Sequence, residues 1–257
     1  MKSPVAALTT ATFVRPDDLR DHTDPAVLYA RSYLLIRLVV GVVGILLPLV
    51  LWTVDALVLQ GSITVRGSLS AYYHSGARDL FVGTLCVTGC LLLTYLAAQR
   101  RTWDYWLSTV AGAAVIGVAL LPTERPPFYP GPPTPLQARW GEHAVATVHF
   151  ACAAVFVLSL AALCFVFAVR DQRYGGHPVL HRVCGVLILA AVAWAALGLV
   201  VDLDLGWLTS LYLGEVAAVW AFGTSWLVKG VDLVHAFPAR DGPQRRPTQS
   251  SAQNGSQ

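Results

Sequence analysis

The feature that most constrains this chain of 257 residues is a set of six long apolar segments that are nearly free of charge. They cover residues 38–59, 80–98, 105–121, 144–169, 183–201 and 207–228, and the first contains one acidic residue, Asp55. Each has about the 17 to 25 residues that a helix needs to cross a hydrocarbon layer of roughly 30 Å. The segments therefore predict membrane crossings.

The composition supports this interpretation, since 55% of the residues are hydrophobic and only 13% are charged. Inside lipid the backbone must satisfy its own hydrogen bonds, so only helices and closed barrels can cross. The segments lack the two-residue alternation of barrel strands. The sequence therefore predicts an all-α fold, a polytopic transmembrane bundle of six helices.

The basic residues predict the orientation of this bundle. If the segments cross in turn, all but four of the 18 Lys and Arg residues lie on the side of the two termini. The exceptions are Arg66, Arg78, Arg125 and Arg139. By the positive-inside rule both termini are then cytoplasmic, and we expect a multi-pass protein in the lipid bilayer of the plasma membrane. The basic residues behind the net charge of +3 are explained by this topology. The charge is therefore no sign of nucleic-acid binding, and we expect no nucleic-acid partner.

Three parts of the chain are expected. Residues 1–33 form a cytoplasmic N-terminal segment, whose four Asp residues and lack of an apolar core do not fit a cleavable signal. Residues 34–230 form the six-helix transmembrane domain. Residues 231–257 are rich in Pro, Gln, Ser and Arg, which predicts a disordered cytoplasmic tail.

Polar side chains gather at the outer ends of the predicted helices and define a candidate pocket. They come from the first outer loop and from the fourth and sixth crossings: Ser70, Tyr73, His74, Arg78, Asp79, Glu142, His149 and Glu215. At 1.5 Å per residue, His149 lies about 9 Å and Glu215 about 12 Å inside the outer ends of their helices. A carboxylate at that depth costs about 2.5 to 3.5 kcal/mol if it faces lipid, so we expect it to face the bundle interior.

The deepest two of these residues have two interpretations. We expect His149 and Glu215 to face each other across the bundle, and we expect His74 and Asp79 to lie above them. The pair either joins two helices through a buried hydrogen bond or belongs to a functional site, where buried ionisable groups tend to cluster.

The shallower residues also have alternatives. Asp79 and Glu142 each begin an apolar segment at its outer end, where a carboxylate can cap the helix instead of serving a pocket. The proline-rich loop at residues 122–133 should run extended across the outer face. It is either a plain connector or a lid that carries Phe128 and Tyr129 over the pocket.

Two runs of sequence resemble a known group of proteins. Residues 68–83 read SLSAYYHSGARDLFVG and residues 117–123 read GVALLPT. Both resemble a group of uncharacterised bacterial membrane proteins with six spans. The resemblance implies a fold and a membrane location, and it implies no activity.

A second resemblance concerns Ser70, His74 and Asp79. Their order is similar to the Ser-x3-His and following Asp of the alkaline ceramidases and adiponectin-receptor-like proteins, which hold zinc together with a late His-x3-His. The present chain has no His-x3-His, and it has six predicted crossings rather than seven. A zinc-dependent hydrolase of this kind would need His74, Asp79 and His149 to converge on one ion, with Glu142 or Glu215 as a further ligand.

The sequence is therefore compatible with three functions. The first is a binding protein whose outward-facing pocket holds a lipid headgroup, a small ligand or a partner helix. The second is a metal-assisted lipid hydrolase, an amidase or esterase with zinc as its cofactor. The third is a proton-coupled carrier that uses His149 and Glu215, although the inner halves of the six segments hold almost no ionisable residue for a path to the cytoplasm. No P-loop, Rossmann, Gly-x-Ser-x-Gly or His-Glu-x-x-His motif supports catalysis of a standard soluble kind.

The topology can be tested with reporter fusions at Gln99, Gly131, Gly175 and the C-terminus. Because six crossings return the chain to its starting side, these fusions should be cytoplasmic, external, cytoplasmic and cytoplasmic. An external C-terminus would mean an odd number of crossings and would contradict the placement of the pocket.

Overall fold

The computed structural model of the protein describes residues 25–58, 65–95, 102–126 and 131–236. These ranges contain six long helices: α3 (Pro25–Val58), α4 (Arg78–Thr94), α5 (Trp103–Leu120), α7 (Glu142–Tyr174), α8 (Pro178–Leu197) and α9 (Ser210–Ala236). They also contain the short helices η1 (Ser70–His74) and α6 (Pro135–Trp140). Since the only bridge within these ranges is an isolated one between Leu205 and Leu208, the predicted all-α fold is confirmed.

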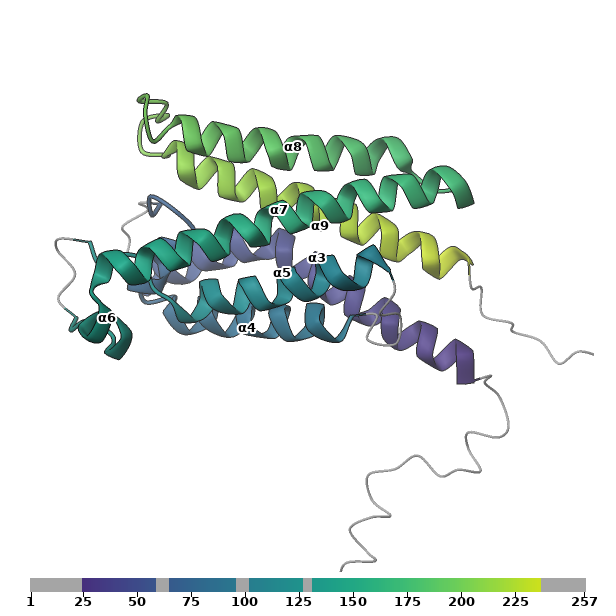
Figure 1. The fold of residues 1–257 in the computed structure, drawn as a ribbon, viewed down its shortest axis with the longest axis horizontal. Helices are drawn as coiled ribbons and strands as arrows, with labels where there is room; N and C mark the ends of the chain where they lie inside the picture. Colours follow the sequence, from purple (N-terminus) through teal and green to yellow (C-terminus); the bar gives the residue numbers. More distant parts are fainter. Residues whose placement is uncertain (1–24, 59–64, 96–101, 127–130, 237–257) are drawn as a thin grey trace, which may run out of the picture.

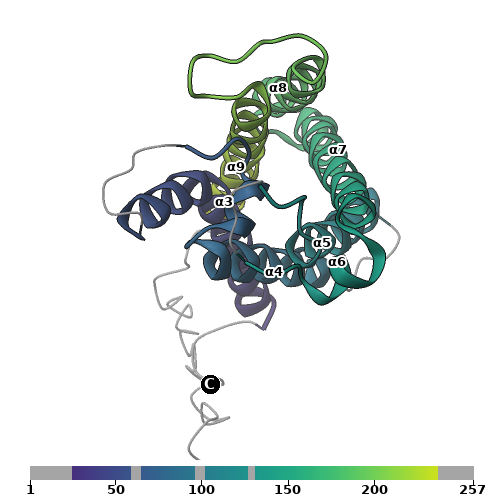
Figure 2. The same ribbon diagram turned by 90° about the vertical axis from the view of Figure 1, so that its left-hand side faces the viewer.

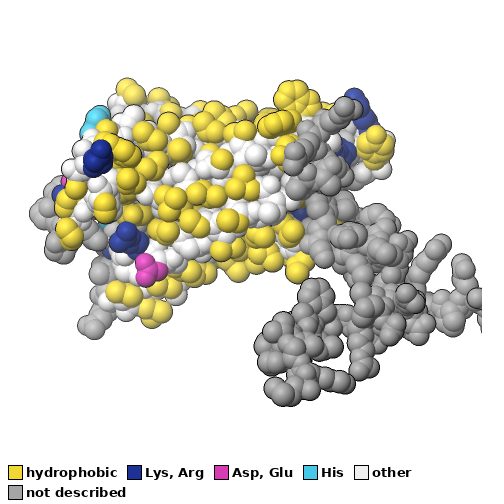
Figure 3. All heavy atoms as spheres, turned by 60° about the horizontal axis from the view of Figure 1, so that its bottom comes forward, with side chains coloured by type: hydrophobic (Ala, Val, Ile, Leu, Met, Phe, Trp, Pro, Cys, Tyr) yellow, Lys and Arg dark blue, Asp and Glu magenta, His cyan; other side chains and the backbone are white. Residues whose placement is uncertain are grey.

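Five of the described helices, α3, α5, α7, α8 and α9, are long and apolar enough to cross a membrane. The remaining long helix, α4, has 17 residues, at the lower end of the range of about 17 to 25 that crossing requires. On the face shown in Figure 3, hydrophobic side chains cover the length of the bundle and Lys and Arg lie only near its two ends. The chain is therefore a membrane protein, and the sixth crossing stays a prediction.

The six long helices follow one another around a ring in chain order, and α9 closes the ring by packing beside α3 (Figure 2). Glycines allow two of the neighbouring pairs to approach closely. A Cβ added to Gly89 of α4 would lie 2.9 Å from the carbonyl oxygen of Gly112 in α5. A Cβ added to Gly223 of α9 would lie 3.1 Å from the carbonyl oxygen of Gly41 in α3. Small residues at such crossings let helix backbones pack directly in lipid.

The described helix ends define two ends of the bundle. Helix α3 begins and α9 ends at one of them, which we call the terminal end, and α6 and η1 lie at the other, the α6 end (Figure 1). Each end has its own hydrophobic core. Phe81, Val115 and Tyr72 belong to the core at the α6 end, whereas Phe167 and Trp226 belong to the core at the terminal end.

Some predictions fall partly or wholly outside the described residues. Helix α3 begins at Pro25 and so includes the last part of the predicted N-terminal segment 1–33. Residues 1–24 and 237–257, which hold most of the predicted N-terminal segment and tail, are not described, and neither are Phe128 and Tyr129 of the predicted lid.

Candidate functional site

A cavity of about 80 Å³ lies inside the bundle at the α6 end. Its polar lining consists of Ser70 from η1, His149 from α7 and Glu215 from α9. All other lining residues are apolar: Leu47, Leu69, Phe81, Leu85, Val115, Val118, Ala153, Phe156, Val157 and Val219. Three of the eight predicted site residues therefore meet in one largely apolar cavity.

Glu215 enters the cavity from the second turn of α9. The backbone N–H of Leu69 donates a hydrogen bond of 2.5 Å to its Oε2 atom. Leu69 immediately precedes η1, whose first N–H groups have no partner within the helix. The carboxylate of Glu215 therefore fixes the start of η1 against α9, and through it Ser70 at the cavity wall.

His149 is buried, with only 1% of its surface exposed, and its Nδ1 atom lies 2.5 Å from the carbonyl oxygen of Leu121. A carbonyl oxygen can only accept, so Nδ1 carries the proton in this contact. His149 and Glu215 thus each bind a main-chain group, and no hydrogen bond or ion pair joins these two described residues. The predicted direct pair is not formed, and what the two side chains share is the cavity.

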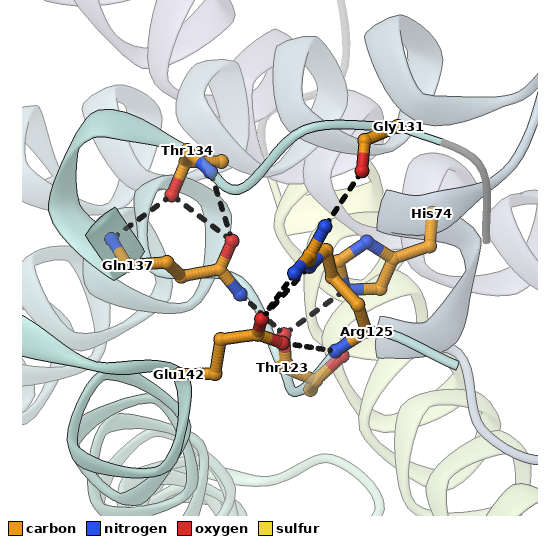
Figure 4. A network of polar contacts seen from close by, with 7 residues as sticks. All are labelled: His74, Thr123, Arg125, Gly131, Thr134, Gln137 and Glu142. Carbon is orange, nitrogen blue, oxygen red and sulfur yellow. Dashed lines mark hydrogen bonds and ion pairs between the residues drawn. The ribbon is translucent and has the colours of Figure 1, made fainter. Parts of the chain in front are cut away.

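Beside the cavity, a network of polar contacts joins η1, the loop between α5 and α6, helix α6 and helix α7 (Figure 4). We call it the α6-end network, and its members are His74, Thr123, Arg125, Gly131, Thr134, Gln137 and Glu142. The carbonyl oxygen of Thr123 accepts hydrogen bonds of 3.0 Å from His74 Nε2 and from Gln137 Nε2. His74 belongs to η1 and Gln137 to α6, where Gln137 also forms a capping box with Thr134. The two short helices are therefore held to one carbonyl group.

Glu142 joins the same network through an ion pair. Its Oε1 atom accepts hydrogen bonds of 2.9 and 2.6 Å from Nε and Nη2 of Arg125, and its Oε2 atom accepts one of 3.1 Å from the Arg125 backbone N–H. Arg125 Nη1 also donates to the carbonyl oxygen of Gly131 at 2.6 Å. Glu142 makes no side-chain cap for α7. It instead ties the loop that follows α5 to the first turn of α7.

The remaining predicted site residues lie outside the cavity. Arg78 packs over the ring of Tyr73, 4.6 Å from its centre, and donates a hydrogen bond of 2.9 Å to the Tyr73 hydroxyl. Asp79 is exposed and lines a separate surface hollow with these two residues. Asp79 therefore does not share the cavity with His149 and Glu215.

The predicted metal site has no set of ligands. Among the residues that the structure describes, no group of three or more His, Cys, Asp or Glu side chains could hold a metal ion. His74 and His149 contact carbonyl groups, and Asp79 points to the surface. The three predicted ligands do not converge, so the zinc prediction gains no support.

A second polar cluster, which the sequence patterns did not predict, is buried at the terminal end. The Asp171 side chain of α7 has no exposed surface and forms ion pairs with Lys229 of α9 and with His181 Nε2 of α8, the latter at 3.1 Å. His181 Nδ1 lies 2.8 Å from the Ser225 hydroxyl. We call Asp171, His181, Ser225 and Lys229 the terminal-end junction, and it joins α7, α8 and α9.

The sequence of contacts from Ser225 through His181 to Asp171 has the order of a Ser–His–acid relay. A nucleophile must reach its substrate, however, and both Ser225 and His181 are fully buried. Lys229 also pairs directly with the acidic member. The junction therefore supports helix packing rather than acyl transfer.

Further buried charges surround this junction. Arg37 of α3 donates to the Tyr95 hydroxyl, and its guanidinium carbon lies 5.0 to 5.2 Å from the ring centres of Tyr95, Phe167 and Trp226. Asp104 of α5, with no exposed side-chain surface, pairs with Arg170 of α7 at 2.6 Å. The inner halves of the six apolar segments themselves hold almost no ionisable residue. These buried charges flank the segments, and the helices extend past the segments far enough to include them.

Comparison with known proteins identifies a family but no activity. A family model described as "Protein of unknown function (DUF998)" matches residues 42–229. No curated protein and no solved structure matches the chain. The match supports the resemblance to an uncharacterised membrane-protein family, and no comparison shows a likeness to alkaline ceramidases.

The terminal-end junction can be tested with a double-mutant cycle. Asp171→Asn removes the carboxylate from its two buried partners, Lys229 and His181. Breaking a buried pair costs about 3 to 5 kcal/mol, so the melting temperature in detergent should fall by roughly 6 to 20 °C. Lys229→Met should be similarly damaging, and the double variant should lose clearly less than the sum. The exposed Arg182→Gln change should leave the melting temperature unaltered. Additive effects of Asp171→Asn and Lys229→Met would mean that the contact between the two side chains contributes nothing to the stability of the fold.

The α6-end network should make stability depend on pH through His74. Burial lowers the pKa of His74 below its ordinary value, against the opposing effect of its hydrogen bond to Thr123. The folded protein therefore binds a proton at His74 less readily than the unfolded chain. The contribution of His74 to the free energy of unfolding is complete above a pH of about 6.5, and it is lost as the pH falls below that value. Between about pH 7.5 and about pH 5, the melting temperature of the wild type should fall further than that of His74→Gln, which keeps a donor but does not titrate. Equal falls in both proteins would refute this assignment.

Proposed function

We propose that this chain, which belongs to the DUF998 family of proteins of unknown function, binds the polar end of a lipid in the cavity at the α6 end. The observation that carries the proposal is the lining of that cavity. Its walls are apolar, and two ionisable side chains, His149 and Glu215, reach it from different helices. Ligand sites are typically apolar with a few placed polar groups, and ionisable residues within a membrane bundle commonly mark such sites.

The cavity favours a small headgroup with hydrogen-bond donors. Its volume of about 80 Å³ is near half that of the roughly 150 Å³ engineered cavity that holds benzene. Only one end of a lipid would fit, with the rest among the helices or in the bilayer. The carboxyl oxygens of Glu215 accept hydrogen bonds, as Oε2 does from the Leu69 N–H group, so Glu215 favours an amine or hydroxyl group.

The proposed setting is the outer half of the plasma membrane. We infer six crossings, with α4 as the sixth, and cytoplasmic termini. Two observations support this: α3 begins and α9 ends at the same end of the bundle (Figure 1), and the sequence places most of its basic residues on that side. The cavity would then face outward.

The other two candidate functions have weaker support. A metal-assisted hydrolase lacks a ligand set among the described residues. A proton-coupled carrier could use ionisable groups at both ends of the bundle, but Leu160, Leu163, Ile188 and Phe222 are buried in the core and present only apolar side chains. A polar path between the two ends would have to pass through such residues, so the binding protein is the function that the site favours.

The proposal can be tested by measuring lipid binding to the purified protein in nanodiscs by native mass spectrometry. The ammonium group of phosphatidylethanolamine donates hydrogen bonds, whereas the headgroup of phosphatidylcholine has no donor. Phosphatidylethanolamine should therefore bind more tightly, by a factor of about ten or more. Glu215→Gln should abolish this preference, because a hydrogen bond to a charged group contributes roughly 1.5 to 3 kcal/mol. Ala153→Leu should abolish binding of both lipids at this site by filling the cavity.

A matched control lies next to the cavity-lining alanine. Ala154 is exposed on the outer surface of α7, so Ala154→Leu makes the same change of size without entering the cavity. It should leave the preference for phosphatidylethanolamine intact. Equal binding of both lipids to the wild type, or the same loss in both Leu variants, would overturn the proposal.

A further inference from the structure

We infer that a groove at the terminal end, between the beginning of α5 and the end of α7, binds the headgroup of an anionic phospholipid. The groove lies at the opposite end of the bundle from the cavity and shares no residue with it. The inference is therefore independent of the proposed function.

The groove is large enough for a headgroup. Its volume is about 520 Å³, within the range of roughly 300 to 1,000 Å³ that is usual for ligand sites. One wall is Trp103, the first residue of α5, and α7 supplies the rest: Phe165, Val166, Val169, Arg170, Arg173 and Tyr174. It thus combines two arginines with an apolar floor and two amphipathic rings.

Arg170 and Arg173 give the groove its charge. They lie three residues apart on α7 and so project from the same side of the helix. Arg170 is held by the buried carboxylate of Asp104, 2.6 Å from its Nη1 atom, while 37% of its side chain stays exposed. Its guanidinium group has five N–H donors, so one ion pair leaves others available for a ligand. Asp104 is a positioning residue here, because it orients Arg170 without facing a headgroup.

Arg173 is the uncompensated charge. Its side chain is exposed, and the described part of the chain offers it no hydrogen-bond or ion-pair partner. Asp104 balances Arg170, so the groove as a whole is positive. Guanidinium groups match the geometry of phosphate oxygens and can bind two of them at once. The charge therefore favours an anionic occupant.

The rings and the apolar floor favour a lipid over a soluble anion. Trp103 is 75% exposed and Tyr174 is 82% exposed. Trp and Tyr concentrate where a membrane meets water, at the height of the headgroups. Val169 is half exposed, and it lies one helical turn before Arg173, farther from the end of α7. A phospholipid could place its phosphate at the arginines and its first acyl carbons against Val169, Val166 and Phe165.

The helix ends alone do not explain an anion site. The C-terminal turn of α7 carries a partial negative charge, which repels a phosphate, and the N-terminal turn of α5 carries a partial positive charge. These two effects oppose each other in the groove. Binding should therefore depend on the arginine side chains, and basic pockets between membrane helices are known to bind anionic headgroups in this way.

The test uses the full-length protein in nanodiscs that contain phosphatidylglycerol and phosphatidylcholine, with bound lipids counted by native mass spectrometry. The wild type should prefer phosphatidylglycerol, and Arg173→Gln should weaken that preference about tenfold, as expected for loss of one charge-assisted contact. Raising the salt concentration should weaken the wild-type preference, because exposed charges are screened. Inorganic phosphate should not compete, since it lacks acyl chains for the apolar floor.

Two further variants keep the test decisive. Arg182→Gln neutralises another exposed arginine at the same end, on α8 and outside the groove, and it should leave the preference unchanged. Arg173→Lys keeps the charge and should retain part of the preference. Equal binding of both lipids to the wild type, an equal loss in Arg173→Gln and Arg182→Gln, or displacement by inorganic phosphate would each overturn the inference.

Discussion

The terminal end of the bundle depends on the contacts of one buried group, the carboxylate of Asp171. It contacts Lys229 of α9 and His181 of α8, and it accepts a hydrogen bond of 3.0 Å from the backbone N–H of His177. The turn between α7 and α8 is built around it: Gly176 has a φ of 139°, and a Cβ there would collide with the Asp171 carboxylate. A charge buried at this depth is tolerable only with such partners, so three helices and one turn are fixed together.

Polar groups hold the bundle at both ends, but they do so in different ways. At the terminal end, side chains of different helices pair with one another, as in the contact between Asp104 and Arg170. At the α6 end, His149 and Glu215 bind main-chain groups of the loops. At the α6 end these two side chains thus hold loops rather than pair one helix with another. The cavity at the α6 end is lined by the same two side chains that hold these loops.

The sequence predicted the helices and the shared cavity better than the contacts within it. The long apolar runs and the depth of His149 and Glu215 are one-dimensional patterns, and both have a direct structural consequence in lipid. Their partners, the carbonyl group of Leu121 and the N–H group of Leu69, carry no sequence signal because every residue has such groups. The terminal-end junction was missed for another reason. Predicted segments stopped at the first flanking charge, whereas α7 continues to Tyr174 and takes Asp171 into the interior.

The basic residues at the terminal end therefore have two kinds of role. Arg37 and Lys229 were counted among the charges that orient the chain, yet both are buried in the folded bundle. Orientation is set while the chain inserts, before those side chains find their partners, so burial does not weaken the topological argument. It does reduce the charge that the folded protein presents to lipid. Arg173 stays exposed beside Trp103, and this is why the groove, rather than the whole basic end, is where an anionic headgroup should be held.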